Sequence, residues 1–384
     1  MRQQSKKRVL IAPDSFKGTM TAGEVCQIIR AAFLEVDPSL EICCIPMADG
    51  GEGTVEAFLS AFGGAQRNAR VHGPLFARLE AAFAILRDGT AVIEMAQAAG
   101  LTLVEEQSRN PFYTSTYGVG ELIRAALDAG CRRILICVGG SGTIDGGLGC
   151  LTALGARFLD SHGREVPPMG CGLGQVEHIL TNGLDQRLCQ TGLTVLCDVD
   201  SPLYGDGGAA FAFGRQKGAN NGQIRVLDAA LRAFAGVVQR DTGRDVGALA
   251  GAGAAGGLAG GLAALAGAEL SSGSDFLLRE MGFDALAQCA ALVVTGEGQL
   301  DSQSVRGKVV AGVARHSGQT PVVAIAGQVE GIQARLAAAL GLTEIYEANV
   351  EKKPFSQVKE CCREDLHRAA LCAARAFLQS EAGK

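Results

Sequence analysis

The chain has 384 residues, a net charge of −5, 20% charged residues and no tryptophan. Its length suits two domains better than one ordinary core. Beyond Lys6, Lys7 and Arg8 the sequence contains no basic cluster, and aromatic residues make up 5%. The composition therefore argues against a nucleic-acid partner, which needs basic surface and stacking side chains, and against binding to an anionic membrane surface.

Two features bear on location. The thirteen cysteines form no Cys-x-x-Cys pair, which predicts reduced thiols in a cytoplasmic protein. The apolar run after the basic start is shorter than the roughly 7–15 residues of a secretory signal. Residues 248–268 carry no charge and are long enough for a membrane helix, but they are nearly all Ala and Gly. We interpret them as a glycine-rich loop that leads into a helix with a small-residue face.

Apolar strands and helices alternate at both ends of the chain. Residues 8–12 (RVLIA) predict a buried strand, followed by a helix over 21–36, a strand over 41–46 and a helix over 53–62. After residue 286 the pattern predicts strands over 291–295, 321–326 and 344–348, and helices over 308–315 and 365–379. Both ends therefore read as parallel βαβ units.

The middle of the chain has a different pattern. Residues 74–96 contain two strand-like runs joined by Asp88-Gly89, which is a hairpin signal. A helix over 116–129 and strands over 133–138 and 193–199 follow. We predict an α/β protein: a doubly wound parallel-sheet domain, residues 1–70 and 280–384, interrupted by an inserted mixed-sheet α/β domain, residues 71–279.

Seven glycine-rich turns follow predicted strands or lie at domain-sized junctions. They cover residues 12–18, 47–53, 138–149, 197–208, 213–220, 251–257 and 295–308. In an open α/β sheet, ligands bind beyond the carboxyl ends of the strands, and glycine there exposes N–H groups that bind anions. Any one of these turns is explained as a structural turn, but nearly all carry Asp or Lys, so together they predict a ligand site.

The charged residues of these turns suggest the kind of ligand. Lys17, Lys217 and Lys308 each stand beside a glycine, an arrangement that suits phosphate. The acids suit Mg²⁺ or a substrate hydroxyl, although a helix N-cap or an Asx turn explains any single one. These acids are Asp14, Asp49, Glu52, Asp145, Asp198, Asp200, Glu297 and Asp301. The residues alone predict a two-domain enzyme that binds a phosphorylated or carboxylated ligand in an interdomain cleft.

Known nucleotide motifs do not fit. A Walker A motif ending at Gly307-Lys308 would need glycine at position 302, which is Ser302. The spacing Gly251-x-Gly253-x-x-Gly256 matches the dinucleotide fingerprint, but no apolar strand precedes it. We therefore interpret that match as chance.

The motifs, taken in order, resemble the bacterial glycerate kinase family. The matching segments are APDSFKG (12–18), PMADGGEGT (46–54), TSTYGVGELI (114–123), GGSGTIDGGLG (139–149), CDVDSPLYGDGGA (197–209), FGRQKGA (213–219), GAGAAGG (251–257) and TGEGQLDSQ (295–303), with Gly307-Lys308 after them. The resemblance runs nearly end to end. Three residues depart from the pattern: Ile144 replaces an expected asparagine, Arg215 a proline and Gln299 an arginine.

The resemblance implies a flavodoxin-like first domain and ATP-dependent phosphorylation of D-glycerate in the presence of Mg²⁺. It favours 2-phosphoglycerate as product, with 3-phosphoglycerate or a related small hydroxy acid as alternatives. Together with the residues, it implies catalytic roles for Asp49, Lys17, Asp198 and Lys217; nucleotide binding by Gly139, Gly140, Ser141, Gly296, Glu297, Gly298, Asp301, Ser302 and Lys308; substrate binding by Asp14, Ser15, Gly50, Gly51 and Glu52; and metal binding by Asp200 and Asp301.

Two other classes of function would require sequence features that differ from those of a kinase. A nicotinamide-dependent hydroxyacid dehydrogenase would carry its fingerprint in the first βα turn, where this chain has PDSFKG. A non-catalytic sugar-acid sensor would carry a DNA-binding helix pair or a basic patch, and the sequence shows neither. The kinase interpretation is therefore favoured.

Overall fold

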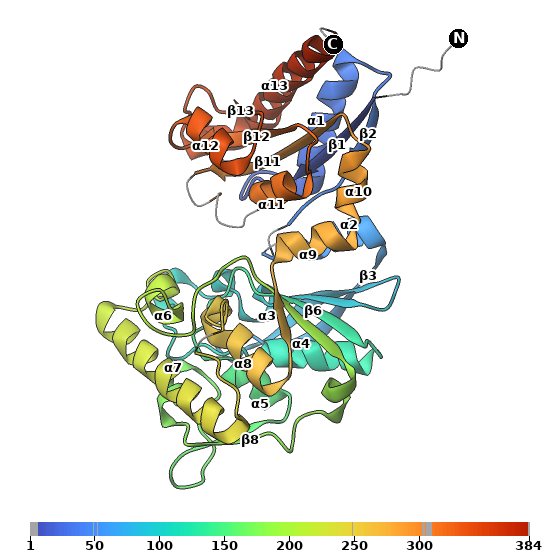
Figure 1. Cartoon of the computed structure of the whole chain (residues 1–384). Helices are drawn as coiled ribbons and strands as arrows, with labels where there is room; N and C mark the ends of the chain where they lie inside the picture. The colour runs from blue at the N-terminus through green and yellow to red at the C-terminus, as the bar shows by residue number, and fades with distance from the viewer. Residues whose placement is uncertain are drawn as a thin grey trace. The chain divides into compact units, whose positions relative to one another are not determined.

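The computed structural model describes residues 7–48, 50–51, 53–247, 249–301, 304 and 309–382. The chain divides into two compact units (Figure 1). The first unit consists of Met1–Asp49 and Gly273–Lys384, and the second of Gly50–Ser272.

The first unit is built on a five-stranded, wholly parallel sheet with the order β13-β12-β11-β1-β2. The strands are β1 (Arg8–Pro13), β2 (Glu41–Cys44), β11 (Leu292–Leu300), β12 (Val322–Val329) and β13 (Glu344–Glu347). Counted along the unit, this order is 2-1-3-4-5, which is that of the flavodoxin-like fold. The prediction of a flavodoxin-like doubly wound sheet is confirmed, and its switch point lies between β1 and β11.

Helices cover this sheet because its strands are apolar on both faces. Helices α1 (Ala22–Val36) and α13 (Phe355–Ala382) pack together over one face, where Val9, Ile11 and Val294 contribute to the core (Figure 1). Helix α11 packs against β1 and β11. The other helices of this unit are α9 (Gly273–Glu280), α10 (Phe283–Gln288), α11 (Val309–His316) and α12 (Gln333–Leu340).

The second unit contains a six-stranded mixed sheet with the order β10-β9-β6-β5-β4-β3. Its strands are β3 (Gly64–His72), β4 (Arg78–Leu86), β5 (Ala91–Glu94), β6 (Arg133–Cys137), β9 (Gly192–Leu196) and β10 (Glu269–Ser271), and a separate ribbon is formed by β7 (Arg157–Leu159) and β8 (His178–Leu180). Strands β3 to β5 pair antiparallel, whereas β5, β6, β9 and β10 pair parallel. The predicted mixed sheet and its Asp88-Gly89 hairpin are confirmed.

Helices of very different length surround this second sheet. They are α2 (Thr54–Phe62), α3 (Ala96–Ala99), α4 (Tyr117–Asp128), α5 (Leu148–Ala153), α6 (Ala209–Phe213), α7 (Asn221–Thr242) and α8 (Leu258–Leu265), with 3-10 turns at Leu101–Leu103, Glu106–Ser108, Gly170–Gln175, Gln186–Gln190 and Ala254–Gly257. Helix α8 is the one predicted to have a small-residue face. A Cβ at Gly261 would lie 2.3 Å from the carbonyl oxygen of Gly146, so this face allows a backbone to approach closely.

Three differences from the sequence prediction affect the segments that line the sites. Helix α2 and strand β3 belong to the second unit, because β3 pairs with β4 along its whole length, so the chain crosses between units near residue 50 rather than 70. Strand β11 continues through Gly296–Leu300, predicted as a loop, because β12 pairs with it as far as Val329. Helix α13 begins ten residues before the predicted start at 365. The domain assignment itself stays a prediction.

Hydropathy along the described helices bears on the membrane alternative. None of them combines the length and the apolar character that a membrane crossing requires.

Candidate functional site

A pocket of about 330 Å³ lies in the first unit at the carboxyl ends of β1 and β11. The two strands are tied together there, because the Asp14 N–H donates to the Gly296 carbonyl at 2.8 Å. In an open α/β sheet, the point where the strand order reverses is where ligands bind. We call this cavity the switch-point pocket. Its lining includes Asp14, Ser15, Lys17, Glu297 and Gly298 from this region, and Asn349, Lys353, Phe355, Val358 and Asp365 from the segment after β13 and from α13.

Two groups of predicted residues meet in this pocket although they are far apart in sequence. Asp14, Ser15 and Lys17 come from the turn after β1, and Glu297 and Gly298 from the distal part of β11. The predictions gave the first group to substrate binding and catalysis and the second to the nucleotide. Their separate roles stay predictions, but they share one cavity.

Glycine at position 298 is explained by a close backbone approach. A Cβ there would lie 3.3 Å from the Cα of Phe16 and 3.4 Å from the backbone nitrogen of Lys17. The carboxylates of Asp14 and Glu297 are both buried, and the Ser15 N–H donates to Asp14 Oδ1 at 2.7 Å. Two buried carboxylates and a lysine therefore line one pocket, a combination that can bind hydroxyls and anions.

Some predicted site residues cannot be placed. Asp49, Glu52, Ser302 and Lys308 lie outside the described residues. Asp301 is described, and its carboxylate accepts the Ser304 N–H at 3.2 Å while Ser304 Oγ accepts the Asp301 N–H at 3.1 Å. Asp301 thus closes a local turn, and its predicted part in nucleotide and metal binding stays a prediction.

The second unit gathers other predicted residues at the carboxyl edge of its sheet. The glycine loop, residues 139–149, follows β6, and Asp198 follows β9. Ser272, which follows β10, donates through Oγ to Asp198 Oδ1 at 2.7 Å. Asp200 lies two residues further on and is exposed. Gly139, Gly140, Ser141 and Asp198 therefore share one edge of the sheet, as ligand-binding residues of parallel strands do.

Gly50 and Gly51 lie against the glycine loop. The Gly139 N–H donates to the Gly50 carbonyl at 3.0 Å, and a Cβ at Gly139 would lie 2.4 Å from the Cα of Gly51. Gly50 has φ +80°, and a Cβ there would lie 2.9 Å from the Leu196 carbonyl oxygen. These glycines bring two loops together at backbone distance, which accounts for part of the glycine content of the ADGGEG turn.

We expect Gly139→Ala to separate these loops and to lower both stability and kcat/KM. The new methyl group has no room to move, since the atoms that it meets are backbone. Overpacking of this kind costs roughly 1–3 kcal/mol. The matched control is Gly236→Ala inside α7, where a Cβ meets nothing within 4 Å and should leave stability equal or higher. Equal urea midpoints for the two variants would contradict the close packing.

Lys217 is buried beneath the glycine loop, with 2% of its surface exposed. Its Nζ lies 2.8 Å from Ser141 Oγ and 2.8 Å from the Thr143 carbonyl oxygen. Burial lowers the pKa of Lys217 to about 7, although the Asp145 charge opposes the shift. The sequence predicted a direct catalytic role, which no observation tests. In the structure, Lys217 reaches the site through Ser141, whose side chain is partly exposed.

Asp145 organises the same loop from within. Its fully buried carboxylate accepts the N–H and Oγ1–H of Thr116, both at 2.8 Å, and the N–H groups of Gly147 at 3.1 Å and Gly149 at 3.2 Å. Burial raises the pKa of Asp145, and these hydrogen bonds oppose the rise. The loop and the start of α4 are therefore held by one carboxylate.

The structure shows the surroundings of two of the three residues that depart from the family pattern, Ile144 and Arg215. Ile144 is fully buried in the core of the second unit, so its side chain belongs to the packing. Arg215 is exposed and donates to Asn221 Oδ1 at 2.9 Å.

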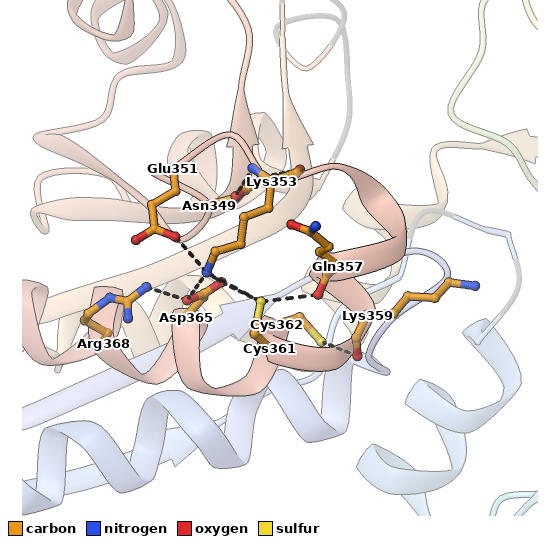
Figure 2. Close-up of polar contacts among 9 residues, drawn as sticks. All are labelled: Asn349, Glu351, Lys353, Gln357, Lys359, Cys361, Cys362, Asp365 and Arg368. Atoms are coloured by element: carbon orange, nitrogen blue, oxygen red, sulfur yellow. Dashed lines mark hydrogen bonds and ion pairs between the residues drawn. The ribbon is translucent and has the colours of Figure 1, made fainter.

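Sequence reasoning missed the wall of the switch-point pocket that follows β13. Figure 2 shows its polar network, in which Lys353 Nζ pairs with Asp365 Oδ2 at 3.1 Å and with Glu351 at 3.2 Å. The Cys361 thiol donates to Asp365 Oδ2 at 3.1 Å, and Arg368 pairs with the same carboxylate. The only signal in the sequence was position, since this segment follows the strand predicted at 344–348.

This network favours the charged forms of two side chains in the wall, the Asp365 carboxylate and the Lys353 ammonium. Burial works against ionisation of Asp365, but hydrogen bonds from Cys361, Lys353 and Arg368 together lower its pKa. Hydrogen bonds to Asp365 first, and then to Glu351, raise the pKa of Lys353. Lys353 is thus a cation committed to neighbouring acids, and it anchors the loop to α13.

Comparisons with known proteins agree with the motifs. The model of the glycerate kinase family matches residues 9–378. The chain is 46% identical to a glycerate kinase of Bacillus subtilis (strain 168), over 84% of this chain and 85% of that protein. It is 45% identical to a glycerate 2-kinase of Escherichia coli (strain K12) over the same shares.

A solved structure extends the likeness to the fold. The crystal structure of a protein assigned as glycerate kinase 2 from Salmonella typhimurium LT2 superposes with a TM-score of 0.84 at 38% identity, covering 98% of this chain and all of that one. The family match spans both units and every segment that lines the two sites. The chain therefore belongs to the glycerate kinase family.

Proposed function

We propose that the protein transfers the γ-phosphoryl group of ATP to a hydroxyl of D-glycerate. The family is one of kinases, which implies ATP as phosphate donor and a small-molecule acceptor. The observation that carries the proposal is the switch-point pocket, where the buried carboxylates of Asp14 and Glu297 share one cavity with Lys17. Phosphoryl transfer depends on positioning and charge neutralisation, and these side chains supply both.

We assign different parts of the reaction to different residues. We assign Asp14 and Ser15 to the hydroxyls of glycerate, and Lys17 to the charge of the transferred phosphoryl group. In the second unit, Gly139, Gly140 and Ser141 present a glycine loop of the kind that binds anionic groups. Lys217 acts as a positioning residue, because its Nζ holds Ser141 and the Thr143 carbonyl rather than open solvent.

We further propose that Mg²⁺ accompanies ATP. Mg²⁺ is usually held by one or two carboxylates together with substrate phosphates, and Asp14 and Glu297 offer such oxygens in one pocket. Asp200 and Asp301 remain candidates as well. When bound, the ion would neutralise charge on the phosphates. Magnesium removal by a chelator should therefore abolish turnover.

The product that we favour is 2-phosphoglycerate, since one close relative bears the name glycerate 2-kinase. A phosphorus spectrum of the purified product distinguishes the 2- from the 3-phosphate. We also propose a reducing compartment, the cytoplasm, because thiols such as Cys26, Cys150 and Cys362 are buried without a disulfide.

The experiment that tests the function couples ADP release to D-glycerate. We expect turnover that needs both substrates, and a fall in kcat/KM of at least about tenfold in Lys17→Ala. The matched control is Lys7→Ala in the same unit, which removes an exposed lysine paired with Glu381 and should leave kcat/KM unchanged. ADP release independent of glycerate, or equal losses in the two variants, would contradict the proposal.

A further inference from the structure

The wall of the switch-point pocket that follows β13 is more apolar than the part of the pocket that carries Asp14, Lys17 and Glu297. It contributes Ala348, Phe355, Val358 and Cys362, which are apolar or weakly polar, to the lining. Its one lining lysine, among the residues that the structure describes, is Lys353, and that ammonium is already bound to Asp365 and Glu351. The Lys359 ammonium lies beside this lining, over the Phe355 ring, with Nζ 5.1 Å from the ring centroid. A wall whose described cations are already engaged in this way does not suit a phosphate or a carboxylate. It suits a neutral, partly apolar group.

One of the exposed large apolar side chains of the first unit belongs to this wall. Among its described residues, the exposed large hydrophobic side chains are Ile332 (57%), Val350 (69%) and Phe355 (56%). Ile332 follows β12, Val350 follows β13, and Phe355 begins α13; of the three, Phe355 lines the pocket. A large aromatic side chain that is exposed and also lines a cavity is available to contact a ligand.

The segment around Phe355 is joined to its surroundings by hydrogen bonds and an ion pair. The segment that carries it is anchored by Lys353, whose N–H donates to Asn349 Oδ1 at 2.9 Å and whose Nζ binds Asp365, a side chain that is 5% exposed (Figure 2). The Val358 N–H donates to the Pro354 carbonyl at 3.1 Å. A phenyl ring on an anchored segment loses little freedom when a planar group stacks on it.

Polar groups complete the site. Gln299 and Gln328 both line the pocket, and they lie opposite each other in the register of β11 and β12. Their amides can donate and accept hydrogen bonds without adding charge. A cavity of about 330 Å³ is at the lower end of the roughly 300–1,000 Å³ range of ligand pockets and exceeds the needs of a three-carbon acid.

We propose that this wall, formed by Ala348, Phe355, Val358 and Cys362 with the Gln299 and Gln328 amides, binds the purine and ribose of ATP, with the base stacked on Phe355. The inference rests on the proposed kinase function. It places the nucleoside in the first unit, beside Asp14 and Lys17.

Direct binding tests this assignment without turnover. The chain has no tryptophan, so Phe355→Trp creates a single indole reporter. We expect its emission to change on addition of adenosine or ADP. In calorimetry, Phe355→Ala should weaken adenosine binding by roughly ten- to a hundredfold, the usual effect of losing one base–aromatic stack, and should leave the binding of inorganic tripolyphosphate unchanged.

The matched control is Phe211→Ala, which removes another exposed phenylalanine, in α6 of the second unit, and should leave adenosine binding unchanged. In steady state, Phe355→Ala should raise KM for ATP and not KM for glycerate. Unchanged adenosine binding in Phe355→Ala, a silent indole, or a rise in KM for glycerate alone would overturn the assignment. If adenosine binding depends on Phe355 but the protein does not phosphorylate glycerate, the proposed function is wrong. The nucleoside site would in that case still be supported.

Discussion

Replacing Lys217 with methionine should lower kcat by at least about a hundredfold and remove one pH-dependent part of the stability. The amine that fixes Ser141 and the Thr143 carbonyl disappears, so the glycine loop loses the geometry that a phosphoryl group requires. The pH effect follows from the depressed pKa, about 7 in the fold against the ordinary 10.5.

The sign of that effect is fixed by proton binding. Between pH 7 and 10.5 the unfolded chain holds a proton on Lys217 that the folded chain has released, so folding stability rises with pH. Below pH 7 both states are protonated, and the cost of the buried charge is fully present. From pH 7 to pH 9 the wild-type protein should therefore gain about 2 kcal/mol relative to Lys217→Met.

Urea unfolding of the two proteins at pH 6, 7, 8 and 9 measures this difference. Lys352→Met serves as control for the substitution itself, because Lys352 is an exposed lysine of the first unit. A constant difference between wild type and Lys217→Met across this range would show that Lys217 keeps an ordinary pKa in the fold.

Asp145→Ala should destabilise the protein by about 3–5 kcal/mol, because it leaves four buried donors without an acceptor. Thr116 loses the partner of its N–H and its hydroxyl, and Gly147 and Gly149 lose the partners of their N–H groups. Asp145→Asn should cost less, since one oxygen remains. The measurement is urea unfolding at pH 7.

The control for Asp145 is Asp206→Ala, which removes an exposed carboxylate from a turn of the same unit. It should change stability by less than about 0.5 kcal/mol. If Asp145→Ala unfolds at the same urea concentration as Asp206→Ala, the hydrogen-bond network around the glycine loop contributes nothing.

The sequence predicted the fold well where hydrophobic period and turn chemistry act locally. The buried run at residues 8–12, the Asp88-Gly89 hairpin and the α/β alternation each depend on neighbouring residues. It failed where partners decide the structure. Gly296–Leu300 reads as a loop in isolation, yet it is a strand because β12 offers hydrogen bonds along its length.

The candidate site shows the same limit. Glycine, Asp and Lys in the turns at 12–18, 139–149 and 213–220 marked residues that the structure places at the carboxyl edges of the two sheets. The wall around Phe355 had no such mark, because its polar groups lie on a loop and a helix that pairs such as Lys353–Asp365 bring together in the fold. The buried state of Lys217 was also hidden, since burial depends on packing from the whole unit.

The pairing of β1 with β11 has a consequence for how the molecule is made. Thr295 Oγ1 donates to the Ala12 carbonyl across 283 positions of the chain. At roughly 5–20 residues per second, the ribosome needs on the order of 15–60 s to deliver this partner after β1 has been synthesised. By the end of that interval the second unit is complete in sequence, whereas the strand that leads to Asp14 has only β2 beside it. The β11 side of the switch-point pocket is therefore missing until the last quarter of the chain is synthesised. Until then, the edge of β1 that pairs with β11 has no neighbouring strand.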